Sequence, residues 1–276
     1  KREVIRVVTP GTNLNVQSLE AGKNNYLLSI AYTPDGIGIS AADVTTGDYY
    51  VTEVEDLKKL NDELMKYEPS EIICNEAFLV SGFDVNDLKS RLHISVNALE
   101  SHMFDDDGCR RILMKHFKVN TLIGLGVEEF PTGLLAAGAL LQYLYDTQKT
   151  DLEHFTHIYP YLTSKYMLLD SSTRRNLELT ETLREKQKRG SLLWVLDKTK
   201  TAMGARLLRN YIEQPLIEKD EMEKRLDAIQ ELNQDSISRD EIREYLNPIY
   251  DLERLLSKVT YKTANPRDLI AFRNSL

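Results

Sequence analysis

The sequence is poor in cysteine, tryptophan and long apolar runs, and each shortage excludes a class of protein. Its 276 residues include 2 cysteines, Cys74 and Cys109, and 1 tryptophan. Cysteines so far apart cannot form a disulfide framework, and neither lies at a spacing typical of zinc ligands. No apolar run approaches the roughly 18 residues of a membrane helix, and no signal-peptide pattern is present. We therefore expect a cytoplasmic protein that does not enter a membrane.

A phosphate-binding loop is also missing. Such a loop needs glycines for close backbone approach, a lysine for the phosphates and Ser or Thr for magnesium. Gly22-Lys23 is followed by Asn24, and the pattern GxxxxGK[ST] occurs nowhere in the sequence. The sequence therefore predicts no nucleotide cofactor and no enzymatic activity in this chain itself.

Charge, by contrast, is plentiful and unevenly distributed. The net charge is −8. Residues 1–164 contain 14 Lys and Arg against 24 Asp and Glu, a balance of −10, and residues 165–276 contain 21 against 19, a balance of +2. Affinity for nucleic acid depends mainly on cations that release phosphate counterions. The first part is therefore a poor surface for DNA and better suited to a protein partner.

Strand and helix patterns alternate in the first part and predict a mixed sheet with flanking helices. Turn residues between the second, third and fourth strands favour an antiparallel meander. Strands are expected at 3–9, 26–32, 36–44, 49–54, 72–74 and 94–98, and helices at 57–67, 85–92, 110–117 and 131–145. Small residues at 136–139 permit the last helix to approach a sheet or another helix closely. Residues 146–164 are expected to be a loop that holds the boundary between two domains.

The second part, residues 165–276, is expected to be helical throughout. Asp170 is a good N-cap for a helix from Ser171 as far as Gly190. Trp194 lies in a second helical piece and is expected in the core. Further helix starts are expected at the N-cap Thr201, at the capping box of Ser238 and Glu241, and at Asn265, and apolar stripes predict helices over 222–232 and 252–259.

Several polar residues could carry chemistry, and each also has a plainer interpretation. Carboxylates that surround two metal ions are the requirement for a nuclease. Candidates for that role are Asp43, Glu53, Glu71 and Glu76, which are otherwise solvated acids at strand ends. Candidates for a cation or metal are Asp105, Asp106, Asp107, Glu153, His154 and His157, which otherwise face a helix start or lie in a loop. Candidates for phosphate contacts are Arg174, Arg175, Lys186, Lys188 and Arg189, which otherwise form a solvated basic face.

Motifs along the whole chain resemble those of MutS-type DNA mismatch repair proteins. The sequences MLLDSSTRRNLEL at 167–179, GSLLWVLDKTKTAMGARLLR at 190–209 and QPL at 214–216 resemble the start of the core domain of that family. VVTPGT at 7–12 and GALLQYL at 138–144 resemble its connector domain, and TANPRDL at 263–269 resembles a segment further downstream. The motifs follow one another in the order of the family.

The resemblance implies an α/β domain followed by an all-α domain. Residues 1–164 would form the connector, with a ribonuclease-H-like fold, and residues 165–276 the first part of the helical core. The chain would be a non-catalytic piece of a longer protein that couples mismatched DNA to an ATPase using ATP and Mg, and that forms a homodimer. Its connector would offer a docking surface for MutL.

The resemblance also implies that mismatched DNA is reached only through the longer protein. The family reads a mismatch with a Phe-x-Glu motif, whereas Phe83 is followed by Asp84 and Val85. The residues on which the fold is expected to depend are structural: Asp170 as a cap, Asn176 as a polar residue of the domain junction, Gly204 for close helix packing and Pro215 as a helix end. Two alternatives stay open, a homologue that acts in recombination or meiosis and a ribonuclease-H-like, metal-dependent nuclease.

Overall fold

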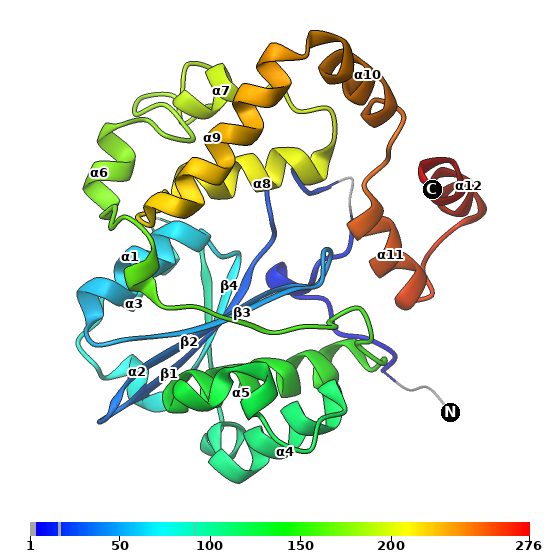
Figure 1. Ribbon diagram of the computed structural model, residues 1–276. Helices are drawn as coiled ribbons and strands as arrows, with labels where there is room; N and C mark the ends of the chain where they lie inside the picture. The colour runs from blue at the N-terminus through cyan, green and yellow to red at the C-terminus, as the bar shows by residue number, and fades with distance from the viewer. Residues whose placement is uncertain (1–3, 16–17, 91) are drawn as a thin grey trace. The chain divides into compact units, whose positions relative to one another are not determined.

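A computed structural model describes residues 4–15, 18–90 and 92–276 and divides the chain into two units (Figure 1). Unit 1 comprises Lys1–Asn15, Asn25–Thr163 and Leu256–Thr263, and unit 2 comprises Val16–Asn24, Ser164–Leu255 and Ala264–Leu276. The chain passes from unit 1 to unit 2 after Thr163, next to the predicted boundary. A single boundary would place segment 16–24 in unit 1 and segment 256–263 in unit 2. Their contacts instead place 16–24 in unit 2 and 256–263 in unit 1.

Unit 1 contains the mixed sheet, as predicted. The described residues form a 6-stranded sheet in the order β5-β4-β1-β2-β3-β6. The strands are β1 Leu27–Thr33, β2 Gly36–Asp43, β3 Asp48–Val54, β4 Glu71–Asn75, β5 Ser95–Leu99 and β6 Tyr159–Pro160. The pairs β1–β2 and β2–β3 are antiparallel and the other pairs are parallel. The predicted meander and the ribonuclease-H-like arrangement of sheet and helices are confirmed.

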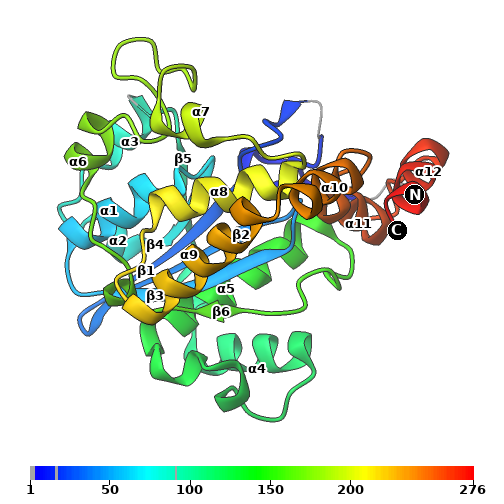
Figure 2. The same ribbon diagram turned by 45° about the horizontal axis from the view of Figure 1, so that its top comes forward.

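Helices cover both faces of this sheet (Figures 1 and 2). The α-helices are α1 Leu57–Tyr67, α2 Glu76–Leu79, α3 Val85–Ser90, α4 Asp106–Phe117 and α5 Pro131–Gln148. Short 3-10 turns occupy Pro10–Thr12, Ser101–Phe104, Ile123–Leu125, Val127–Glu129 and Thr163–Lys165. Alternate strand residues point to opposite faces. Thus Leu27 packs with α4 and α5 on one face, and its neighbour Leu28 packs with α1, α2 and α3 on the other.

Small residues let α5 lie unusually close to β2. A Cβ added at Gly38 would lie 2.0 Å from the carbonyl oxygen of Thr132 at the start of α5. Gly138 likewise lets α5 lie close to α4, because a Cβ added there would lie 2.3 Å from the Cβ of Cys109. The predicted role of the small residues at 136–139 is confirmed, since Ala136, Ala137 and Ala139 are fully buried.

Unit 2 is built from helices. They are α6 Ser171–Asn176, α7 Leu192–Leu196, α8 Ala202–Glu213, α9 Lys219–Gln234, α10 Ser236–Leu246 and α12 Pro266–Ser275, and α11 Leu252–Thr260 belongs to it as far as Leu255. Most begin at a side-chain cap, which satisfies a backbone N–H that has no partner within the helix. The caps are Asp170, Ser191, Thr201, Asp235 and Asn265.

The helix predicted from Ser171 to Gly190 is wrong beyond Asn176. Glu178 adopts a left-handed conformation with φ 48°. Its backbone oxygen accepts a hydrogen bond from Leu192, at 3.0 Å, and its side chain accepts one from the backbone of Leu183, at 2.7 Å. The charged run 183–189 is mostly exposed and offers no apolar stripe that could hold a helix on a core.

Other predicted boundaries also need correction. Residues 4–9 form no strand, and residue 3 lies outside the described residues, as does residue 91 after α3. The segment 146–164 is not a simple loop, because α5 continues to Gln148 and β6 pairs with β3. The helix expected at 110–117 starts at Asp106, since Asp105 caps it. The helix expected at Ser238 starts at Ser236, because Asp235 accepts the hydrogen bond from the backbone N–H of Ser238.

Apolar side chains of unit 2 are often exposed. Trp194, expected in the core, is 48% exposed, and Leu193 beside it is the buried residue of α7. The predicted stripe at 222–232 is also exposed, with Leu226 at 61% and Ile229 at 63%. Among the described residues, no helix is long and apolar enough to cross a membrane.

We predict that Gly38→Ala lowers the free energy of unfolding by about 3 kcal/mol or more, since the new methyl group would collide with the backbone of α5. Urea denaturation followed by circular dichroism measures the change. Gly124→Ala is the matched control, because no atom lies within 4 Å of its added Cβ, and its effect should stay within about 0.5 kcal/mol. Equal effects of the two substitutions would contradict the close packing.

Candidate functional site

Three of the four carboxylates that could have served a nuclease bind protein donors instead. Asp43 accepts hydrogen bonds from the backbone of Asn25, at 2.9 Å, and from the backbone and hydroxyl of Thr45, at 2.8 and 2.7 Å. Glu53 accepts the backbone N–H groups of Thr132 and Gly133 at the start of α5, at 2.5 and 2.9 Å. Each carboxylate therefore stabilises a turn or a helix start.

The other two acids differ from each other. Glu71 is fully buried and accepts hydrogen bonds from the backbone of Gly11, at 3.0 Å, the amide of Asn97, at 3.0 Å, and the hydroxyl of Tyr143, at 2.8 Å. Glu76 is exposed at the start of α2. Within the described part of the chain, no group of His, Cys, Asp or Glu is arranged to hold a metal ion.

Three of the remaining candidate metal ligands have structural partners. Asp105 caps α4 through the backbone of Gly108, at 2.9 Å, and Asp106 pairs with Arg110, at 2.8 Å. His154 is buried against the ring of Tyr261, with 4.9 Å between ring centroids, and burial lowers its pKa to about 4. The plainer interpretation of these residues is the one that fits the structure.

The carboxyl ends of β1 and β4 meet at an open hollow of about 510 Å³ in unit 1. Such edges are where open α/β sheets bind ligands. Asn75, which ends β4, uses its amide on the backbone of Tyr32, at 3.1 and 2.8 Å. The lining is Tyr32, Thr33, Pro34, Asp35, Gly36, Ile37, Glu55, Asp56, Leu57 and Ala77.

This hollow combines acidic and apolar groups. It is lined by three acids and no basic residue, and two residues beyond Ala77 the exposed pair Leu79 and Val80 begins, with exposures of 44% and 85%. Asp56 caps α1, and Glu55 pairs with Lys59 at 2.5 Å, so these acids are already held by the protein. The hollow suits contact with a protein surface better than metal-dependent chemistry.

Asp170 and Pro215 lie where a cap and a helix end are needed. The Asp170 carboxylate accepts a hydrogen bond from the backbone of Thr173, at 2.6 Å. Pro215 follows the end of α8 at Glu213, and its carbonyl oxygen accepts a hydrogen bond from Met167, at 2.8 Å. Both residues therefore position the segment that leads into α6.

Asn176 and Gly204 both lie near one end of a helix. Asn176 is exposed at the end of α6, and its role at the domain junction stays a prediction. An added Cβ at Gly204 would meet Thr201 at 3.2 Å and Thr199 at 3.5 Å. Because these residues belong to the loop before α8, Gly204 serves the start of its own helix and does not bring two helices together.

Two of the basic candidates have partners in the protein, and the other three are exposed. Arg174 donates to the backbone oxygen of Leu169, at 2.9 Å, and Lys188 pairs with Asp197, at 2.5 Å. Arg175, Lys186 and Arg189 are exposed. This arrangement fits a solvated basic face better than a phosphate site.

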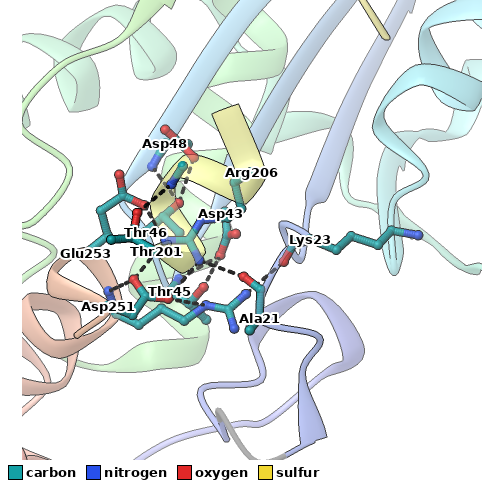
Figure 3. A network of polar contacts seen from close by, with 12 residues as sticks. Ala21, Lys23, Asp43, Thr45, Thr46, Asp48, Thr201, Arg206, Asp251 and Glu253 are labelled. Atoms are coloured by element: carbon teal, nitrogen blue, oxygen red, sulfur yellow. Dashed lines mark hydrogen bonds and ion pairs between the residues drawn. The ribbon is translucent and has the colours of Figure 1, made fainter. Parts of the chain in front are cut away.

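Sequence reasoning missed a buried ionic cluster in unit 2 (Figure 3). Arg206 of α8 is 4% exposed and makes two hydrogen bonds with Asp251, at 2.7 and 2.8 Å, and one with Glu253, at 2.5 Å. Burial lowers the pKa of Arg206, but its bonds with Asp251 and Glu253 outweigh this and raise the pKa above its ordinary value. The guanidinium is therefore permanently charged and paired.

A second arginine lies beside the first. Arg254 is 2% exposed, and Asp251 also accepts a hydrogen bond from its backbone, at 3.3 Å. The sequence pattern predicted the apolar face of α8 but gave no role to Arg206. Its acidic partners lie 45 and 47 positions away, so no local spacing connects them with it. Only the fold brings these groups together.

Comparisons with known proteins agree along the whole chain. The family model described as MutS domain II matches residues 25–156, and the one described as MutS domain III matches residues 172–276. The DNA mismatch repair protein MutS of Lachnoclostridium phytofermentans is 63% identical over 276 residues, which are 100% of this chain and 30% of that protein. Proteins of the same name from Ruminiclostridium cellulolyticum and Acetivibrio thermocellus are 46% and 43% identical, and the chain covers 32% of each. The chain thus spans about a third of the length of these relatives.

We predict that Asp170→Ala lowers the free energy of unfolding of unit 2 by about 0.5–2 kcal/mol, the usual effect of losing an N-cap. Urea denaturation measures it. Glu181→Ala removes an exposed acid outside a helix and should change stability by less than about 0.5 kcal/mol. If both variants have the same urea midpoint as the unsubstituted chain, the cap does not contribute to the stability of unit 2.

We also predict that Cys74 and Cys109 do not react with a thiol reagent in the native protein at pH 8. Both are buried, and burial raises the pKa of Cys74 to about 11 and that of Cys109 to about 12, so the reactive thiolate is scarce. Labelling with an aromatic disulfide that releases a coloured thiolate, before and after denaturation, measures this. Ser90→Cys, at an exposed position, is the control that should react at once. Rapid labelling of the unmodified native chain would contradict the prediction.

Proposed function

Because this chain belongs to the MutS family of DNA mismatch repair proteins, and carries its domains II and III, we propose that it is a non-catalytic part of a longer MutS protein. In that protein it couples the binding of mismatched DNA to an ATPase. ATP and Mg bind elsewhere in the longer protein, which works as a homodimer in the cytoplasm. The absence of a phosphate loop from the sequence supports this division of labour.

The second part of the proposal is that unit 1 docks a MutL-type protein. The observation that carries it is the hollow at the ends of β1 and β4, with its acids and the exposed Leu79 and Val80 nearby. Residues 1–164 have a balance of −10, which repels DNA phosphates and attracts a basic protein surface. Apolar side chains at such a place supply the contact that charge alone does not.

The two alternatives have less support. A ribonuclease-H-like nuclease needs several carboxylates around metal ions. Asp43, Glu53 and Glu71 each bind separate protein donors instead. A homologue that acts in recombination or meiosis is not favoured either, because the relatives named above are described as mismatch repair proteins.

We predict that single cysteines near the hollow crosslink to MutL in the full-length protein when mismatched DNA and ATP are present. Asp35→Cys and Lys58→Cys place thiols at exposed positions around the hollow, and Asn86→Cys places one on α3. Cys74 and Cys109 are buried, and the full-length protein without an added cysteine measures the crosslinking from any other native thiol. Crosslinked product is measured by electrophoresis and mass spectrometry.

Two control positions decide between the possible outcomes. Arg111→Cys lies on α4, across the sheet, and Glu223→Cys lies on α9 in unit 2. Crosslinking from Arg111→Cys alone would place MutL on the other face of unit 1. Crosslinking from Glu223→Cys alone would overturn docking through unit 1.

A further inference from the structure

Residues 18–24, here called the arm, have an unusual position in the chain. The segment Val16–Asn24 belongs to unit 2, whereas Lys1–Asn15 and Asn25–Thr163 on either side of it belong to unit 1. The arm therefore makes an excursion from unit 1 and leads directly to β1, the strand at Leu27–Thr33. Whatever holds the arm also restrains this connection.

Two buried arginines hold the arm by its backbone. Arg206 donates to the carbonyl oxygen of Ala21, at 3.0 Å, as Figure 3 shows. Arg254 donates to the carbonyl oxygens of Glu20 and Lys23, at 3.1 and 2.8 Å. Hydrogen bonds from a charged donor are stronger than those between neutral groups. The arm is thus bound through its backbone oxygens, so these bonds do not depend on the identity of its side chains.

Acidic side chains outside the arm orient the two arginines. Asp251 and Glu253 orient Arg206, and Asp251 also lies 3.8 Å from the guanidinium of Arg254. A planar guanidinium can serve a carboxylate and a carbonyl at once, which a lysine cannot do with the same geometry. The receiving surface on α8 and the start of α11 is therefore preorganised.

The described residues of the arm bury little side-chain surface. Ser18, Glu20 and Ala21 are exposed, and Leu19 is only partly buried. At Gly22 the arm lies close to α8, since an added Cβ would lie 3.4 Å from that of Ala205. A segment that buries little apolar surface can detach without opening a core.

We propose that the arm is a latch, closed by Arg206 and Arg254, whose opening frees the connection into β1 while both units stay folded. Closed, the latch keeps the chain before β1 attached to α8 and α11. Open, it lengthens the free segment of chain that precedes β1. Its use in transmitting a signal rests on the coupling proposed above, but the latch itself does not.

Limited proteolysis of the full 276-residue chain with trypsin tests the latch. Trypsin cuts after Lys and Arg, and the carbonyl group at the Lys23–Asn24 bond is the one that Arg254 holds. Cutting at this bond therefore requires the latch to open. The exposed basic residues Lys186, Lys188 and Arg189 provide cuts in the same molecule that do not depend on it.

Arg254→Gln removes the charged donor, and Ala205→Gln places a larger side chain under Gly22 while both arginines remain. We expect each to speed cutting after Lys23 at least tenfold, which is about 1.4 kcal/mol in the opening equilibrium. Cutting at 186–189 should not change. The matched control is Arg209→Gln, which breaks an ion pair of 3.1 Å with Glu213 on the same helix.

The outcomes are distinct. An unchanged rate after Lys23 in variants with native circular dichroism would overturn the latch. So would an equal acceleration in Arg209→Gln, because general loosening of α8 would then explain it. A wild-type chain cut as fast after Lys23 as at 186–189 would show that no latch is closed. None of these results bears on MutL crosslinking, so the latch and the docking proposal can fail separately.

Discussion

The close approach of α5 to β2 is the constraint on which unit 1 depends. An α-helix packs closely on a sheet where the side chains between them interlock or are very small. Between α5 and β2 they are very small. Gly38 lies against the backbone of Thr132, and Gly138 lies against Cys109 on α4. With α5 fixed in this way, Leu134, Leu141 and Leu144 close the apolar core beneath the sheet. The opposite face is then left to α1, α2 and α3, which leads to the hollow beside α1 and α2.

Unit 2 follows a different principle. Its best buried side chains include Arg206 and Arg254, while Trp194 and Leu226 are exposed. Buried charges are tolerated only when they are paired and hydrogen-bonded, and removing one partner is costly because it leaves the other uncompensated. Asp251 and Glu253 satisfy this condition for Arg206. The cluster therefore specifies which segments meet at α8 and α11, and it holds a connection that apolar contacts do not.

The acids of unit 1 show how one residue type serves different ends. Glu71 is enclosed by donors from Gly11, Asn97 and Tyr143, and so stabilises the fold. Asp35 and Glu55 stay at the surface, where their charges face solvent.

The sequence by itself determined the elements with a strong local signal. Period-two strands, turn residues and the caps Asp170, Thr201 and Asn265 were predictable because each depends on neighbours within a few positions. The end of α6 at Asn176, the exposure of Trp194 and the pairing of Arg206 with Asp251 were decided only by the tertiary structure. Arg206 and Asp251 are 45 positions apart, and periodicity reports which face of a helix is apolar, not which distant group will reach it.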